Sequence, residues 1–168
     1  MKRIATFEKV SEKTFRAAWA DTFGTDCAGE YESIRLPERA TAGSAGYDFF
    51  STRTFTLGAG ESIKIPTGIR VRMEEGWVLQ LFPRSGLGFR YRLQLDNTVG
   101  IIDGDYYFSD NEGHIFIKIT NDSHADKALT VQAGEAFAQG IFTEFGITTD
   151  DDASGVRNGG FGSTSVKR

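Results

Sequence analysis

The chain is poor in the residues from which disulfide bonds and metal centres are built. Its 168 residues include one cysteine, Cys27, and two histidines, His114 and His124. One cysteine cannot form an internal disulfide, and so few ligands make a zinc site hard to build. The sequence also lacks the His-x-Glu and Pro-Cys-x-x-Cys pair of zinc nucleoside deaminases, which excludes that class of enzyme.

Long apolar runs and an excess of positive charge are absent as well. No run approaches the ~18 apolar residues of a membrane-spanning helix, and residues 1–6 lack the apolar core of a signal peptide. The net charge of −4 argues against a general nucleic-acid-binding face, which would be basic. A Walker A loop and a nucleophile elbow are also missing. We therefore expect a cytoplasmic protein that binds neither membranes nor nucleic acid directly.

Glycine and aromatic residues, by contrast, are abundant. The chain has 20 glycines, 14 phenylalanines and 5 tyrosines. Short runs of strand-forming residues recur between glycine turns, and residues 63–65, 69–73 and 114–120 alternate between two sets of side chains. Many short strands separated by turns predict an all-β fold, a barrel or jelly roll, in a single domain spanning residues 1–168.

One segment near the N-terminus has a helical pattern. Ser11 is suited to cap a helix over residues 12–23, and Phe15, Trp19 and Phe23 fall on one face of that helix. The pattern predicts an amphipathic helix that covers the core, and no second helix. The flanking residues 4–10 and 31–36 are each predicted to form a strand.

The most informative stretch is residues 97–107, where an apolar run meets Asp103-Gly104. An Asp-Gly pair between strand formers predicts a hairpin with a type I′ turn, and a plain hairpin is the simplest interpretation. The functional alternative is a general base, because Asp103 follows two isoleucines and Asp105 can share its face. Tyr106 would supply a flat wall and Asn97 an amide, a combination that suits a small planar ligand.

Two further stretches have the chemistry of phosphate binding. Arg84-Ser85-Gly86 combines a cation, a hydroxyl and accessible backbone N–H groups. The tail combines Arg157 with glycines, hydroxyl residues and Phe161. A surface turn and a disordered terminus are the simpler interpretations. Phe161 between glycines has no core around it, and stacking on a base would explain it.

Five segments of this kind occur in order along the chain. They are Ala45-Gly46-Tyr47-Asp48, Pro83-Arg84-Ser85-Gly86-Leu87-Gly88, Gly100-Ile101-Ile102-Asp103-Gly104-Asp105-Tyr106, Gly134-Glu135-Ala136-Phe137-Ala138-Gln139 and Gly159-Gly160-Phe161-Gly162-Ser163-Thr164. This order resembles the five motifs of the trimeric dUTP pyrophosphatases (dUTPases), of bacterial or phage type. The resemblance implies a jelly-roll-like barrel, with an N-terminal strand–helix extension over residues 1–30 and a flexible C-terminal arm over residues 150–168.

The resemblance also implies an activity. A homotrimer would hydrolyse dUTP to dUMP and pyrophosphate, limiting uracil incorporation into DNA and supplying dUMP for thymidylate synthesis. Mg²⁺ would be the cofactor, held chiefly by the triphosphate and water rather than directly by the protein. Asp103 would deprotonate the attacking water, and Tyr106 would pack on the deoxyribose and exclude a 2′-hydroxyl.

The other site residues that the resemblance implies form three groups. Uracil would be bound by Asn97 and by the backbone of Gly100, Ile101 and Ile102. The phosphates would be bound by Arg84, Ser85, Gly86 and Gln139, with Asp48 supporting the phosphate and metal region. The arm that closes over the nucleotide would comprise Arg157, Phe161, Gly162, Ser163 and Thr164.

The chain departs from the family pattern at two places, and two alternative functions stay open. Residues 107–113 lengthen the segment after Tyr106, and one residue instead of two separates Arg157 from the double glycine. A dCTP deaminase of the same fold is an alternative that the hairpin and the Phe-containing tail disfavour. A phage-type dUTPase that also binds a regulatory protein is another, with the N-terminal helix and residues 107–113 as candidate surfaces.

Overall fold

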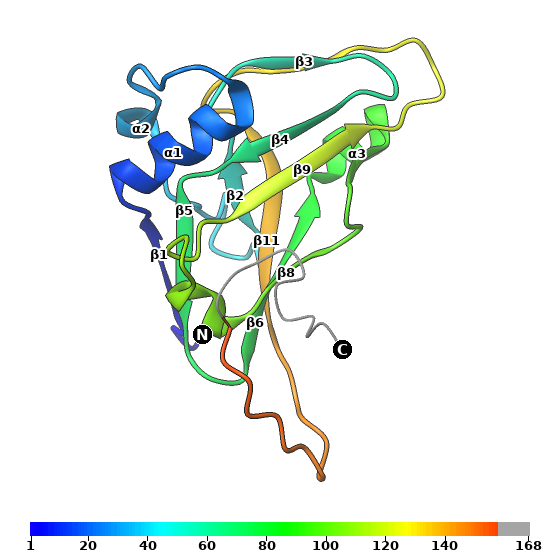
Figure 1. The fold of residues 1–168 in the computed structure, drawn as a ribbon. Helices are drawn as coiled ribbons and strands as arrows, with labels where there is room; N and C mark the ends of the chain where they lie inside the picture. Colours follow the sequence, from blue (N-terminus) through cyan, green and yellow to red (C-terminus); the bar gives the residue numbers. More distant parts are fainter. Residues whose placement is uncertain (158–168) are drawn as a thin grey trace, which may run out of the picture.

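The computed structural model describes residues 1–157, in which strands dominate (Figure 1). The strands are β1 (Ala5–Lys9), β2 (Tyr47–Phe50), β3 (Phe55–Leu57), β4 (Ser62–Pro66), β5 (Ile69–Met73), β6 (Trp77–Pro83), β7 (Leu93–Leu95), β8 (Gly100–Ile102), β9 (Phe116–Asn121), β10 (Leu129–Val131) and β11 (Ala136–Glu144). The helices are α1 (Glu12–Phe23), α2 (Glu30–Ser33), α3 (Ser85–Tyr91) and the 3₁₀-helix η1 (Gly104–Phe108). No helix in this described part is long and apolar enough to cross a membrane.

The strands pair antiparallel in four sheets that surround one core. The largest sheet has the order β2-β11-β6-β8, and the next has the order β4-β9-β7. Two further pairs, β1-β5 and β10-β3, complete the arrangement. The described chain is therefore mostly β, as the sequence predicts.

The two larger sheets bury their facing side chains against each other. The core residues that are at most 1% exposed include Phe49, Leu79, Leu81 and Phe137 from the larger sheet and Ile65, Ile117 and Ile119 from the smaller one. Burying a side chain of this size stabilises the fold by about 1.5–3 kcal/mol. The alternation predicted for residues 114–120 is confirmed from Ile115 onwards, since Ile115, Ile117 and Ile119 face the core while Lys118 is exposed; at His114, which is buried, it is wrong.

Helix α1 completes the core on one side of the barrel. It begins after Ser11, whose hydroxyl accepts a hydrogen bond of 3.2 Å from the Thr14 amide, and ends at Gly24 in the left-handed conformation. Phe15 and Trp19 are 0% and 3% exposed, so the predicted helix and its buried face are confirmed. His114 is buried beneath Phe15, and this burial lowers the pKa of His114 to about 4.

Two secondary-structure predictions are wrong. Residues 31–36 form no strand, because α2 begins at Glu30 and Tyr31 turns inward to pack on Phe15 and donate a hydrogen bond to the Val10 carbonyl. α3 was not predicted, because Gly86 and Gly88 lower its intrinsic helix propensity. Tertiary packing determines the secondary structure of both segments.

The predicted type I′ hairpin at Asp103-Gly104 is also wrong. Gly104 lacks the positive φ that such a turn requires, and within residues 1–157 β8 pairs with β6 alone. The chain instead enters η1, with Asp103 as its N-cap, and η1 packs toward β5, where Gly104 lies near Met73. This 3₁₀-helix, rather than a hairpin strand, places Tyr106.

The start of α1 is fastened to the lengthened segment after Tyr106. The Glu112 carboxylate accepts hydrogen bonds from the Ser11 hydroxyl and the Thr14 hydroxyl, both 2.5 Å, and from the Ser11 amide at 2.8 Å. These bonds, assisted by the charge of Arg70, lower the pKa of Glu112 to about 2 from its usual 4.5. The bonded carboxylate is therefore ionised over the whole neutral range.

Glu112 should make the fold acid-sensitive. Its pKa is lower folded than unfolded, so the stabilisation it provides is complete above pH 4.5 and is lost as the pH falls towards 2. Glu112→Gln should be less stable than the parent near neutrality, and the difference should shrink as the pH is lowered through this window. Denaturant unfolding at a series of pH values measures this. A stability difference that does not change with pH would contradict the assignment.

Candidate active site

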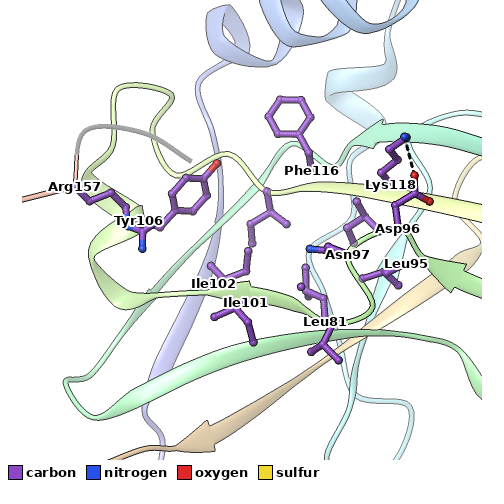
Figure 2. A pocket seen from close by; sticks show the side chains of 14 residues that line it. Leu81, Leu95, Asp96, Asn97, Ile101, Ile102, Tyr106, Phe116, Lys118 and Arg157 are labelled. Atoms are coloured by element: carbon purple, nitrogen blue, oxygen red, sulfur yellow. Dashed lines mark ion pairs between the residues drawn. The ribbon is translucent and has the colours of Figure 1, made fainter. Parts of the chain in front are cut away.

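A pocket of about 510 Å³ lies where the two larger sheets diverge (Figure 2). Its lining comprises Leu81, Leu95, Asp96, Asn97, Val99, Gly100, Ile101, Ile102, Tyr106, Ile115, Phe116, Ile117, Lys118 and Arg157. These residues come from β6, the end of β7, the β7–β8 turn, β8, η1, β9 with the residue before it, and the C-terminal segment. Most of them are apolar, and the polar groups gather at the two ends of the pocket: Arg157 and the Tyr106 hydroxyl at one, Asn97, Asp96 and Lys118 at the other.

β8 gives the pocket a row of backbone hydrogen-bonding groups. β8 is the end strand of its sheet, paired on one side with β6 in the register Leu81 to Gly100. The other edge is open to the pocket, so its amides and carbonyls can bind the edge of a planar ring. Glycine fits tightly at position 100, because a Cβ there would lie 3.0 Å from the Leu81 Cβ and Leu81 would have to shift to make room.

A tight turn brings Asn97 to the pocket. Thr98 adopts φ 67°, and its amide donates to the Leu95 carbonyl at 2.8 Å. Because β7 belongs to one sheet and β8 to the other, this turn carries the chain across the gap between them. Asn97 therefore sits at the mouth of the gap, where the sequence predicts a ligand-binding amide.

Tyr106 is held rigidly in the wall. It is 6% exposed, and its hydroxyl donates to the His114 carbonyl at 2.7 Å and accepts from the Asn111 amide at 2.8 Å. Burial raises the pKa of Tyr106, against the opposing influence of Asn111 and Arg157. The ring is thus a neutral, fixed surface, as the predicted wall requires.

Asp103 lies at the edge of the pocket, directly after Ile102. Arg157 donates to the Asp103 carboxylate through Nη2 and to the Asp105 carboxylate through Nε, the latter at 2.9 Å. The predicted sharing of a face by the two aspartates is therefore confirmed. Arg157 contacts Oδ2 of Asp103, and that side chain is still 45% exposed, which leaves room for water at the carboxylate.

The predicted phosphate-binding residues gather elsewhere, around the end of β6. Asp48 of β2 lies opposite Gln139 of β11 and forms an ion pair with Arg84 at 3.3 Å. Gln139 donates to the Pro83 carbonyl at 3.1 Å. Arg84, Ser85 and Gly86 are exposed where α3 begins. We call these residues the β6-end cluster: Asp48, Arg84, Ser85, Gly86 and Gln139.

The structure therefore groups the predicted site residues into two sets. The pocket is lined by Asn97, the three β8 residues, Tyr106 and Arg157, and no member of the β6-end cluster is among its lining residues. The segment Phe161, Gly162, Ser163 and Thr164 lies outside the described residues, so its role stays a prediction. Sequence reasoning missed Asp96 and Lys118, which form a 2.7 Å ion pair at the pocket. The only sequence signal for them was their polar position in or next to an alternating strand.

The acidic residues are too dispersed to form a metal centre by themselves. Across residues 1–157, no group of three or more His, Cys, Asp or Glu side chains is placed to hold a metal ion. Asp48 is already paired with Arg84, and Asp103 with Arg157. Such a donor set fits a hard cation whose ligands are mostly substrate phosphates and water.

Comparison with known proteins identifies the family. The family model described as dUTPase matches residues 32–165. The deoxyuridine 5′-triphosphate nucleotidohydrolase of Lactococcus lactis is 40% identical over 136 residues, covering 79% of this chain and 89% of that relative. The corresponding protein of Hahella chejuensis is 38% identical over 142 residues, covering 80% and 89%.

Solved structures share the fold. The crystal structure of the dUTPase from Streptococcus mutans is 38% identical with a TM-score of 0.63, covering 84% of this chain and 97% of that one. The Staphylococcus bacteriophage 80alpha dUTPase is 21% identical with a TM-score of 0.63, covering 94% and 100%. The family match, the jelly-roll-like fold and the ordered motifs lead to one conclusion: the chain belongs to the dUTPase family, whose members hydrolyse dUTP to dUMP and pyrophosphate.

Proposed function

We propose that the pocket binds the deoxyuridine part of dUTP in the cytoplasmic nucleotide pool. The observation that carries this proposal is the open edge of β8, which faces a pocket closed by the buried Tyr106 ring. Backbone groups on β8, with the Asn97 amide, can pair with the uracil edge and leave buried groups unpaired when cytosine enters. Tyr106 packs against the sugar, where a 2′-hydroxyl would clash.

Asp103 acts as the general base in this proposal. Its carboxylate follows the end of β8 directly, and its side chain is 45% exposed, so an attacking water can reach it. Arg157 fixes the carboxylate through Oδ2, so the other oxygen can take the proton of the attacking water. Positioning of this kind contributes about 10²–10⁴-fold to a hydrolysis rate.

The β6-end cluster binds the triphosphate. Arg84 supplies a fixed cation, and Ser85, Gly86 and Gln139 supply donors to phosphate oxygens. Asp48 holds the Arg84 guanidinium in place. Mg²⁺ held by the phosphates and water would supply charge neutralisation for the leaving pyrophosphate. The tail from Phe161 to Thr164 is proposed to close over the base and exclude bulk water.

Replacing the base should stop turnover without preventing binding. We expect Asp103→Asn to bind dUTP and to lose about 10²–10⁴-fold in kcat, because the amide cannot accept the water proton. Pyrophosphate release with dUTP and Mg²⁺ measures turnover. The matched control is Asp105→Asn, which loses the same arginine partner but should keep most of its turnover. Near-normal kcat in Asp103→Asn would contradict the assignment.

We further propose that the enzyme works as a homotrimer with sites shared between subunits. Within one chain, no residue of the β6-end cluster lines the pocket. A complete site needs both sets of residues, and a neighbouring subunit in a closed ring can supply the second one.

Mixing two inactive variants tests this sharing. Asp103→Asn chains keep the β6-end cluster, and Arg84→Ala chains keep the pocket. After joint unfolding and refolding at equal amounts, about a quarter of sites should regain activity, since three-quarters of random trimers are mixed and each has one complete site in three. Each variant refolded alone is the control. Mixed trimers verified by mass that show no activity would defeat the shared-site proposal and leave the family assignment intact.

A regulatory role is a second proposal. Phe108, the last residue of η1, lies in the lengthened segment and is 78% exposed, so its ring is available for contact with a protein. Deleting residues 1–30 would not test this, because Phe15 and Trp19 belong to the core. Phe108→Ser removes the ring without touching the core; we expect it to keep dUTP hydrolysis and to lose partner binding. Unchanged binding would exclude this surface.

A further inference from the structure

Two parts of the chain that lie apart from the ordered motifs are bonded to each other. The family match begins at residue 32, so β1 and α1 precede it, and residues 107–113 are the lengthened segment. Glu112 accepts the three hydrogen bonds from Ser11 and Thr14 described above. The segment is thereby attached to the first turn of α1.

A second attachment holds the other end of the segment. The Tyr107 hydroxyl donates to the Glu8 carboxylate of β1 at 2.8 Å. Arg70 of β5 donates to the same Glu8 oxygen at 2.9 Å and to the Tyr107 hydroxyl at 2.7 Å, with its guanidinium 4.2 Å from the centre of the Tyr107 ring. Residues 107 and 112 are therefore both fixed to the N-terminal extension or to the strand paired with it.

Asn111 lies between these attachments and contacts the pocket wall. Its amide donates to the Tyr106 hydroxyl at 2.8 Å, while its carbonyl oxygen accepts from the Ser109 hydroxyl at 2.9 Å and the Gly113 amide at 3.2 Å. The Ser109 hydroxyl also donates to the Tyr106 carbonyl at 2.6 Å. The segment thus forms hydrogen bonds with both the backbone carbonyl and the ring hydroxyl of Tyr106.

The backbone of the segment adopts a costly conformation. Glu112 has φ 61°, a left-handed value that is unfavourable for a residue other than glycine. Gly113 follows at φ 71°, and a Cβ there would lie 2.7 Å from the Tyr107 Cα. Strain of this kind persists where surrounding contacts fix it and gathers at functional sites. Here the Glu112 carboxylate provides those contacts.

We propose that Glu112 and Asn111 are positioning residues for sugar discrimination, which hold the Tyr106 ring in place by tying residues 107–113 to α1. The inference rests on the proposed role of Tyr106 as the wall against the 2′-hydroxyl. The Tyr106 ring can exclude the 2′-hydroxyl of a ribonucleotide only if the ring does not move. A displacement of about 1 Å can change reactivity 10²-fold. The N-terminal extension thereby contributes to substrate choice without touching the substrate.

The test compares kcat/KM for dUTP and UTP across single variants. Asn111→Ala removes the amide that holds the Tyr106 hydroxyl. Glu112→Gly removes the carboxylate, while glycine adopts the left-handed backbone conformation without strain. This variant therefore tests the loss of the hydrogen bonds separately from backbone strain. We expect each to lower the dUTP-to-UTP ratio of kcat/KM by about fivefold or more, mainly by improving UTP. Discrimination against dTTP, which depends on β8, should not change.

Control variants separate positioning from general stability. Glu12→Gln breaks an exposed ion pair with Arg16 on the same helix and should leave the ratio unchanged. Glu112→Gln keeps one acceptor and should lie between the parent and Glu112→Gly. Melting temperatures show that assays are run on folded protein. If Glu112→Gly is too unstable to assay, Asn111→Ala provides the test, because it leaves the attachment to α1 intact.

The outcomes identify which statement fails. Tyr106→Leu should itself reduce discrimination against UTP. If Tyr106→Leu does so while Asn111→Ala and Glu112→Gly leave the ratio at the parent value, the positioning inference is overturned and the proposed function stands. If Tyr106→Leu leaves the ratio unchanged, the wall role of Tyr106 fails, and the inference fails with it.

Discussion

The open edge of β8 is the constraint on which the candidate site depends. β8 is three residues long and is followed directly by η1, and among residues 1–157 it is paired on one side only, so its other edge presents a short row of backbone groups. Long open edges invite association with other chains, and the turn at Thr98 and the 3₁₀-helix keep this one short. The pocket exists because β7 and β8 belong to different sheets, so the chain must cross the gap between them.

Around this edge, buried polar groups are satisfied in a way that fixes the aromatic wall. Tyr106 bonds to His114, and His114 accepts a hydrogen bond from the Gly68 amide while packing beneath α1. The charged side chains of Glu8, Arg70 and Glu112 attach the loop on its outer side. The N-terminal extension is thus continuous with the core and with the wall of the pocket, rather than an appendage to the barrel.

The distribution of the motifs over the fold underlies the proposal that sites are shared between subunits. β2, β6 and β11 are neighbours in one sheet, so Asp48, Arg84 and Gln139 meet at its surface. The elements that line the pocket follow β7 and lie next to β9. No residue of the β6-end cluster lines this pocket, and assembly of subunits is one way to join the two sets.

The sequence by itself determined the strand-rich class, the amphipathic α1 and the identity of the motif residues. These depend on local period, capping and side-chain chemistry, which a linear pattern records. Tertiary structure decided the rest: η1 in place of the Asp103-Gly104 hairpin, α2 in place of a strand, and the attachment of Glu112 to Ser11 across about a hundred residues. Non-local packing overrides local propensity in such segments, because burying Tyr106 outweighs the local turn preference and packing Tyr31 against Phe15 outweighs the local strand preference.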